Sequence, residues 1–234
     1  MAIPSFFHPD LCESDSNVDL QPEEAAHALK SRRLKVGQPV RLLNGQGLVG
    51  NGQLQIIDKK RAAVKMFEFT RHDRPAQQLT VAAAVPKGDR QKVMLDMLTQ
   101  SGCAKIVPIQ YEYSVTKFSD KLRVKWQRAV IESCKQSQNP WVPEVADSQT
   151  LDELLACSSD PMMYADAEGV SMRDCVRQGP VATVLIGPEG GFSPQEYEYF
   201  RVNGLIAVRL GPHILRTEAA AVVAAAQWVQ LFNT

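Results

Sequence analysis

The sequence predicts an α/β protein in two parts, a small β-barrel followed by a larger domain with a mostly parallel sheet. Three observations carry this prediction. The first 73 residues hold closely spaced short strands joined by turn dipeptides. From Leu79 onward, apolar strands alternate with helical periodicities, which is typical of a parallel sheet covered on both faces. A polar stretch that ends in proline, Arg71–Pro75, separates the two patterns. We therefore expect domains at residues 1–73 and 74–234.

The predicted barrel begins with a short helix over Glu23–Ser31, which follows Gln21-Pro22. Three strands come next, each with β-type alternation or a β-branched run. They are expected at Pro39–Leu43, Gly47–Ile57 and Ala62–Thr70, with turns at Asn44–Gly45 and Asn51–Gly52.

The second domain is predicted to contain five strands, and the first of them, Leu79–Val85, is a continuous apolar run of the kind buried on both faces. They are expected at Leu79–Val85, Lys105–Gln110, Met162–Ala165, Val181–Ile186 and Leu205–Leu210.

Helices between these strands are marked by their caps and periodicities. Val93, Met94, Met97 and Leu98 recur at helical spacing before Gly102, which ends that helix. Ser119 is expected to cap a long helix that buries Trp126 and Val130. Capping boxes begin at Thr150 and Ser193, and the latter has Pro194 at the first helical position. The final helix is expected from about Thr217 to about Phe232.

Composition excludes several classes of protein. No apolar run approaches the roughly 20 residues of a membrane helix, and Met1–Asp10 lacks the pattern of a signal peptide. The five cysteines are odd in number and never form C-x-x-C, which indicates free thiols in a reducing cytoplasm. The four histidines are scattered, so we expect no metal site.

Charge is distributed unevenly although the net formal charge of the 234 residues is zero. Residues 28–74 carry eleven Lys and Arg against three acids, a net charge of +8. This block is either a surface that contacts nucleic-acid phosphates or a solvated β-surface whose edges lysines protect from aggregation.

Two loops near the end of the chain are the strongest candidate for a ligand site. Each follows an apolar strand, contains Gly-Pro and leads into a helix: Gly187–Ser193 and Leu210–Thr217. Glycine bares the backbone for hydrogen bonds and leaves room for a flat ring. The loops lack both G-x-G-x-x-G and the Gly-Lys-Ser/Thr of a P-loop, so neither a dinucleotide nor a nucleoside triphosphate is supported.

Polar residues in these loops have structural and functional interpretations. Thr217 is expected to cap the last helix and Glu218 to be a first-turn acid favoured by the helix dipole. Arg216 either buries its stem with its guanidinium held by loop carbonyls or grips a phosphate. Glu189 is a candidate for binding ligand hydroxyls or, less readily, for acting as a base, and His213 is expected to be structural.

The two loops resemble those of a known family. Leu185–Ser193, followed by Leu210–Pro212 and Ile214–Glu218, is similar to the RsmE family of ribosomal RNA uridine-N3 methyltransferases, which belongs to the SPOUT superfamily. The similarity extends to other parts of the chain: Pro86–Arg90, Ile106–Pro108, Glu112-x-Ser114–Val115, Gln136–Ser137, Val142–Glu144, and in the first domain His27, Arg33–Leu34–Lys35-x-Gly37 and Asn44–Gly45-x-Gly47.

The resemblance implies a PUA-like RNA-binding barrel, a SPOUT domain with a trefoil knot, and a homodimer. It implies S-adenosyl-L-methionine as methyl donor and 16S rRNA of the small ribosomal subunit as substrate. The donor-binding residues would be Ile186, Gly187, Glu189, Gly190, Gly191, Leu210, Gly211, Ile214, Leu215, Thr217 and Ala219. Arg216 would be the candidate catalytic residue, stabilising the anion that develops at the uracil oxygens.

RNA contacts are expected from basic residues of both domains. They are His27, Arg32, Arg33, Lys35, Arg41, Lys87 and Arg90. The chain departs from the family pattern at Ala2, Ser5, Gln100–Ser101, Gln138–Asn139 and His213. Because most of these changes remove a basic residue, the donor site is retained more fully than the RNA-facing set.

Two other functions remain open at this point. A non-catalytic RNA-binding or ribosome-assembly factor would keep the fold without binding the donor. A nucleotide-dependent oxidoreductase is disfavoured by the missing dinucleotide fingerprint.

Overall fold

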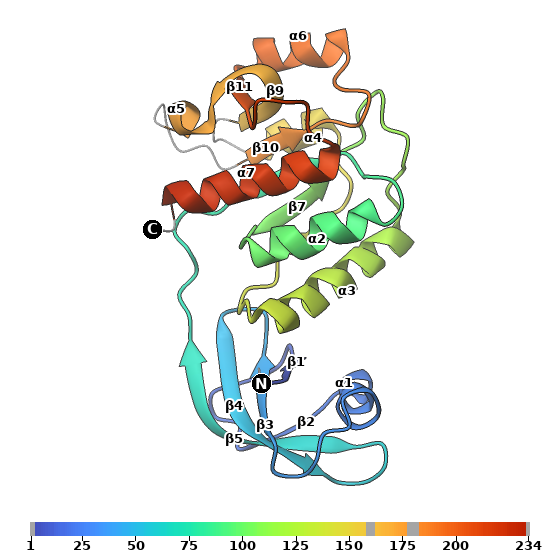
Figure 1. Cartoon of the computed structure of the whole chain (residues 1–234), viewed down its shortest axis with the longest axis vertical. Helices are drawn as coiled ribbons and strands as arrows, with labels where there is room; N and C mark the ends of the chain where they lie inside the picture. The colour runs from blue at the N-terminus through green and yellow to red at the C-terminus, as the bar shows by residue number, and fades with distance from the viewer. Residues whose placement is uncertain (1–2, 158–161, 177–182, 233–234) are drawn as a thin grey trace. The chain divides into compact units, whose positions relative to one another are not determined.

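The computed structural model describes residues 3–157, 162–176 and 183–232, and its elements are labelled in Figure 1. Contacts between residues divide the chain into two units. The first unit runs up to Arg74 and also takes Ile131–Val142; the second contains Pro75–Val130 and the chain from Pro143 onward. The domain limits expected from the sequence, 1–73 and 74–234, stay a prediction.

The first unit is built on a curled five-stranded sheet with the order β1-β3-β4-β5-β2. Only β1 and β3 pair in parallel, and the other neighbours are antiparallel. The three long strands lie where the sequence predicts them, and their inward side chains, including Leu42, Leu54 and Val64, are fully buried. The strands are β1 (Ser5–Phe7), β2 (Asn17–Asp19), β3 (Pro39–Leu43), β4 (Leu48–Ile56) and β5 (Ala62–Arg71).

The predicted helix over Glu23–Ser31 is confirmed, with an irregular second half. The α-helix α1 (Pro22–Ala26) passes into a π-helical turn over His27–Ser31, in which Arg32 N donates to the carbonyl of His27 across five residues. A π turn replaces the regular hydrogen bonds of the α-helix by bonds across five residues, and such turns are often found at functional positions.

Residues 131–142 join this unit through a buried ion pair and a turn. Lys135 Nζ lies 2.7 Å from Glu24 Oε1, and both residues are only 9% exposed. The turn after β3 also bonds this segment, because Val142 N donates to Gly45 O at 3.0 Å. The predicted turn at Asn44–Gly45 is therefore an attachment point for residues distant in sequence.

The second unit contains a six-stranded sheet in which every described pairing is parallel, with the order β11-β9-β10-β6-β7-β8. The expected strands are present, although β9 is longer than predicted, and of the predicted run Val181–Ile186 the residues before Thr183 lie outside the described part. The strands are β6 (Thr80–Ala83), β7 (Lys105–Pro108), β8 (Glu144–Val145), β9 (Met162–Ser171), β10 (Thr183–Ile186) and β11 (Ile206–Arg209).

Helices of the second unit follow the predicted caps. Thr150 and Ser193 both form the expected capping boxes, and Ser119 Oγ accepts from Leu122 N at 3.3 Å at the start of the long helix. The helices are α2 (Arg90–Gln100), α3 (Asp120–Ser137), α4 (Leu151–Ala156), α5 (Met172–Val176), α6 (Pro194–Val202) and α7 (Thr217–Phe232), and the residues of α3 from Ile131 onward belong to the first unit. Helix α7 packs against α2 and also contacts β6 and β10 (Figure 1). Of the helices described, none is both long and apolar enough to cross a bilayer.

Candidate functional site

The two glycine-bearing loops leave the sheet at the same edge. Strands β10 and β11 both pair in parallel with β9, so their carboxyl ends lie on one side. Ile186 and Leu210, the last apolar residues before each loop, are 1% and 8% exposed. Buried strand ends thus hold two loops beside each other, which is where open α/β sheets bind ligands.

A hydrogen bond links the second loop to the first. Thr217 Oγ1 donates to the carbonyl oxygen of Gly187 at 3.0 Å. Thr217 is also buried and is the first residue of α7, while Ala220 N bonds the carbonyl of Arg216. The expectation that Thr217 caps α7 is therefore wrong, because Arg216 occupies the position before the helix and supplies its first carbonyl acceptor.

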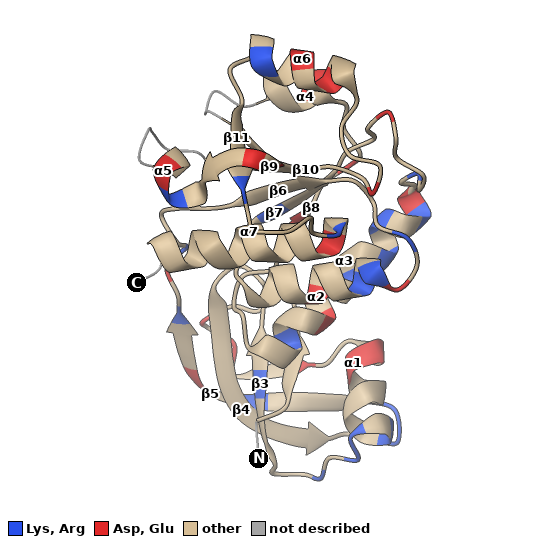
Figure 2. Cartoon of the chain, turned by 45° about the horizontal axis from the view of Figure 1, so that its top comes forward, with Lys and Arg blue, Asp and Glu red and all other residues tan. Residues whose placement is uncertain are grey.

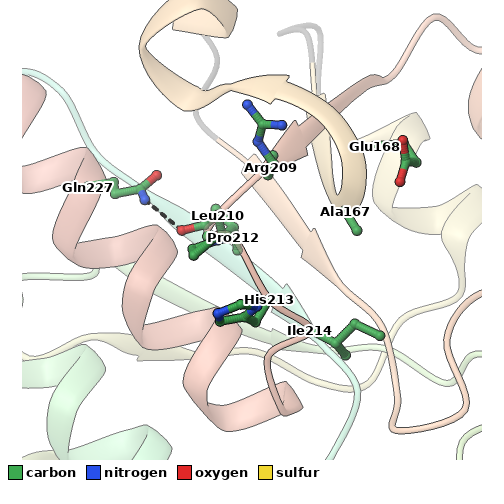
Figure 3. Close-up of a pocket in the computed structure, with 9 residues that line it drawn as sticks. Ala167, Glu168, Arg209, Leu210, Pro212, His213, Ile214 and Gln227 are labelled. Atoms are coloured by element: carbon green, nitrogen blue, oxygen red, sulfur yellow. Dashed lines mark hydrogen bonds between the residues drawn. The ribbon is translucent and has the colours of Figure 1, made fainter.

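A hollow of about 930 Å³ lies against the second loop (Figure 3). It is formed by two residues of the strand β9, by the end of β11 with the loop that follows, and by one side chain of α7. That side chain is Gln227, whose Nε2 donates to Leu210 O at 2.9 Å and so holds the loop backbone. The lining residues are Ala167, Glu168, Arg209, Leu210, Gly211, Pro212, His213, Ile214 and Gln227.

Three of the predicted donor-binding residues line this hollow, namely Leu210, Gly211 and Ile214. Ile214 is 93% exposed, an unusual state for an apolar side chain on a loop. The other predicted donor-binding residues do not line it, and they belong to the end of β10, to the first loop, to the second loop and to the start of α7: Ile186, Gly187, Glu189, Gly190, Gly191, Leu215, Thr217 and Ala219.

The first loop has the backbone that a glycine pair permits. Gly191 takes φ +75°, a conformation that other residues rarely adopt. Gly190 lies against Tyr113, and a Cβ placed on Gly190 would be 3.1 Å from the Cβ of that tyrosine. Substituting either glycine would therefore change the shape of the loop.

Support for the first loop comes from the capping box of α6. Glu196, 8% exposed, accepts from Ser193 N and also from Glu112 N at 2.9 Å, so it ties the start of α6 to the segment around Glu112.

Tyr197 of the same helix has a raised pKa. Burial and then a hydrogen bond to Asp166 of β9 raise the pKa of Tyr197 to about 12. Tyr197 is therefore neutral at physiological pH and can donate to the strand that leads to the hollow.

Arg90 connects α2 to both loops. Its Nη1 lies 3.5 Å from Glu189 Oε1, and its Nε lies 3.8 Å from Glu218 Oε1. Glu218 is a first-turn acid of α7, as expected, and its Oε2 is buried without a hydrogen-bond partner among the described residues. Arg90, expected to contact RNA, and Glu189, expected to bind the donor, are thus paired with each other.

Arg216 is exposed, and within the described residues its guanidinium has neither an ion pair nor a hydrogen bond. The expectation that loop carbonyls hold this group is not met. Its positive charge is therefore available to bind an anion beside the two loops.

Several basic residues expected to bind RNA gather at the π turn of the first unit. Arg32 Nε donates to His27 Nε2 at 3.0 Å, and Arg33 takes φ +51°. Lys35 is exposed close by in sequence. Arg41 instead donates to Asn51 and to Gln138, so its guanidinium is partly engaged within the unit.

The sequence did not indicate the contributions of β9 and α7 to the hollow. Ala167 and Glu168 lie within β9, beyond the predicted strand end at Ala165. Gln227 lies in the apolar run of α7, which it interrupts together with Gln230, and this interruption was the available signal. Among the described residues, no three His, Cys, Asp or Glu side chains are grouped so as to hold a metal ion.

Comparison with known families gives two matches. A family model described as an RNA methyltransferase domain matches residues 73–229, and one described as an RNA methyltransferase PUA domain matches residues 20–67.

Individual relatives agree with these matches. Ribosomal RNA small subunit methyltransferase E of Rickettsia conorii is 29% identical over 91% of this chain and 89% of its own length. The protein of that name from Aquifex aeolicus is 30% identical over 75% of this chain and 81% of its own. The crystal structure of the Neisseria gonorrhoeae enzyme of that name, bound to S-adenosyl methionine, superposes with a TM-score of 0.91 at 26% identity and covers 99% of this chain and 98% of that one.

Proposed function

The chain belongs to the RNA methyltransferase family, and from this membership we propose that it methylates N3 of a uridine in 16S rRNA of the small ribosomal subunit. The methyl donor is S-adenosyl-L-methionine, as in the solved relative that covers 99% of this chain. The observation that carries the proposal is the pair of loops joined by Thr217 and Gly187 at one edge of the sheet.

The residues present fit such a donor. The hollow of about 930 Å³ is within the range of small-molecule sites, and backbone groups of Leu210 and Gly211 lie along it. The exposed Ile214 side chain offers an apolar surface for a flat ring. When bound, the donor supplies an electrophilic methyl group on a sulfonium.

The predicted donor-binding residues outside the hollow are proposed to complete the site from the first loop. Gly187, Gly190 and Gly191 bare their backbone there, and Glu189 is proposed to accept from ligand hydroxyls. Ile186 and Leu215 flank the two loops, and Thr217 keeps the loops together. These residues orient the donor, and orientation supplies much of the acceleration in a bimolecular displacement.

Arg216 is proposed to act on the acceptor. Uridine N3 lies on the Watson–Crick edge and carries a proton, so the base must be unpaired and the proton lost before N3 can accept a methyl group. A guanidinium beside O2 or O4 stabilises the negative charge that develops there. The proposal is supported by the exposure of Arg216 on the second loop and by its lack of an ion pair among the described residues.

The first unit is proposed to hold the RNA. His27, Arg32, Arg33 and Lys35 form a basic turn, with Arg41 on β3, and Lys87 adds a charge from the second unit. Arg90, already paired with two carboxylates, contributes chiefly by fixing the loops.

We also propose a trefoil knot in the C-terminal domain and a homodimer. The order β11-β9-β10-β6 is compatible with the family's threading of the two loops. A dimer is supported by Val93 and Met97, which are 50% and 43% exposed one turn apart on α2. Light scattering on the Val93→Lys variant should show monomers if the face of α2 that carries Val93 and Met97 is the interface.

As an enzyme that modifies ribosomal RNA, the protein would act in the cytoplasm.

The direct test is incubation of the protein with labelled donor and unmodified small subunits. We expect N3-methyluridine in the digested rRNA, and its absence would refute the substrate. A non-catalytic assembly factor instead predicts no heat of donor binding in calorimetry. It also predicts no change in function when Gly190 is replaced by a bulky residue.

A further inference from the structure

One face of α3 carries basic residues that the donor and barrel sites do not use. Lys121, Lys125 and Arg128 recur at helical spacing, and all three are exposed. Lys117 is exposed in the loop that leads into the helix. Trp126 and Val130, each 1% exposed, lie on the side packed into the unit. We refer to the four cations as the α3 basic face; α3 is drawn with its charges in Figure 2.

The charge of this face is not balanced locally. Residues 117–128 contain five basic residues and only one acid, Asp120. Arg123 is paired with Asp147 at 2.7 Å, whereas the four residues of the α3 basic face form no ion pair with any described residue. Cations spaced four apart on a helix repel each other, so this arrangement costs stability in the free protein. A bound polyanion would remove that repulsion.

The α3 basic face begins at the edge of the donor site. The loop before it is tied to the first glycine-bearing loop, because Tyr113 lies against Gly190 and Glu112 N donates to Glu196 at 2.9 Å. Farther along, Trp126 Nε1 donates to Gln91 Oε1 at 3.0 Å, which fixes α3 beside the first turn of α2. That turn also holds Arg90, the partner of Glu189.

We propose that Lys117, Lys121, Lys125 and Arg128 bind the phosphate backbone of the RNA strand next to the target nucleotide. From Lys121 to Arg128 the helix rises about 10 Å, so the cations of this face can contact more than one phosphate of the same strand. The inference rests on the proposed function, and it adds a second RNA contact to the one expected from residues 28–74. Its occupant is a single RNA strand, chosen because the face is uniformly cationic and adjoins the site where the base must be presented unpaired.

The test compares Lys121→Gln/Lys125→Gln with the wild-type protein in binding to a 16S rRNA fragment at several salt concentrations. Each lost phosphate contact lowers the slope of log K against log salt by about 0.7 for a single strand. We therefore expect the slope to fall by roughly 1.4 and the KM for RNA to rise, while the calorimetric donor affinity stays unchanged. Lys121→Arg/Lys125→Arg should keep the wild-type slope.

A matched control removes two positive charges elsewhere on the same unit. Arg173→Gln/Arg201→Gln changes exposed residues of α5 and α6 and has the same net charge as the Lys121/Lys125 variant. If the control lowers the slope equally, or if Lys121→Gln/Lys125→Gln leaves slope and KM unaltered, the α3 basic face does not bind RNA. The proposed function is judged separately, because its failure would be the absence of N3-methyluridine with the wild-type protein.

Discussion

The hydroxyl of Thr217 donates a 3.0 Å hydrogen bond to the carbonyl oxygen of Gly187, thirty residues earlier in the chain. This bond joins the start of α7 to the end of β10, and therefore joins the two loops from which the donor site is proposed. Thr217 is 3% exposed, so water does not readily replace the bond when it is lost.

Replacing Thr217 by valine should loosen the two loops. The substitution keeps the shape but removes the donor to Gly187 O, at a cost of about 1 kcal/mol. Calorimetry should then show donor binding weakened about fivefold. Thr217→Ser retains the hydroxyl and should bind within twofold of wild type; equal affinity of the valine variant would show that the bond does not shape the site.

Replacing Arg90 by glutamine should affect the donor rather than the RNA. The change removes the cation that faces Glu189 and Glu218, and a partly exposed pair of this kind contributes about 1 kcal/mol. We expect donor affinity to fall several-fold and the salt dependence of RNA binding to stay constant. Lys87→Gln changes an exposed residue that is unpaired among those described, and it should lower the salt dependence of RNA binding while donor affinity stays constant. If Arg90→Gln also lowered the salt dependence of RNA binding, Arg90 would be an RNA contact.

Gly191 is expected to resist substitution because of its backbone. Its φ of +75° costs a residue with a Cβ roughly 1–2 kcal/mol. Gly191→Ala should lower the free energy of unfolding by that amount in urea titrations, although no atom lies within 4 Å of the new methyl group. Asparagine tolerates this conformation better, so Gly191→Asn should lose less; an equal loss would point to a cause other than φ.

The buried pair of the first unit should be intolerant of losing one partner. Lys135→Met leaves Glu24 buried, with Oε2 already lacking a partner among the described residues. We expect a loss of about 3–5 kcal/mol in unfolding free energy. Glu24→Met/Lys135→Met should recover much of it, since no buried charge remains and the other partner of Lys135, Glu132, is exposed. If the double variant is as unstable as the single one, packing rather than charge explains the effect.

Alkaline pH should destabilise the fold through its buried thiols. Burial raises the pKa of both Cys103 and Cys134 from 9.0 to about 12. Below pH 9 both states hold the proton, but between pH 9 and 12 the unfolded state releases it first, so stability falls as pH rises. Each thiol should cost about 1 kcal/mol between pH 9 and 10, and about 1.4 kcal/mol for the next pH unit. Cys103→Ala should remove the contribution of one thiol from this slope, and an unchanged slope would rule out that thiol.

The sequence predicted the positions of the two loops better than it predicted the contacts of individual side chains. Gly187–Ser193 and Leu210–Thr217 were found because strand runs, Gly-Pro pairs and helix starts are local signals. Thr217 was assigned to a cap because Ser and Thr at helix starts usually cap. That preference was overridden by an acceptor on the neighbouring loop, Gly187 O.

The division of the chain into two units was also not predictable from local patterns in the sequence. Helix α3 was predicted from its periodicity, but nothing in that periodicity indicated that Ile131–Val142 packs with the first unit. Lys135 reads as a surface residue in sequence and is buried in the structure, because Glu24, 111 residues earlier, compensates its charge.

By itself, the sequence determined where most strands and helices and the glycine-bearing loops lie, although not β1, β2, β8 or α5, and it determined the charge block of residues 28–74. These features depend on side-chain spacings of two to four residues and on caps, which act within a few residues of the chain. Only the tertiary structure decided that β9 lies between β10 and β11, that Ala167 and Glu168 line the hollow, and that Gln227 and Arg90 hold the loops. The physical reason is that strand order is settled by packing between distant segments, and no local spacing encodes it.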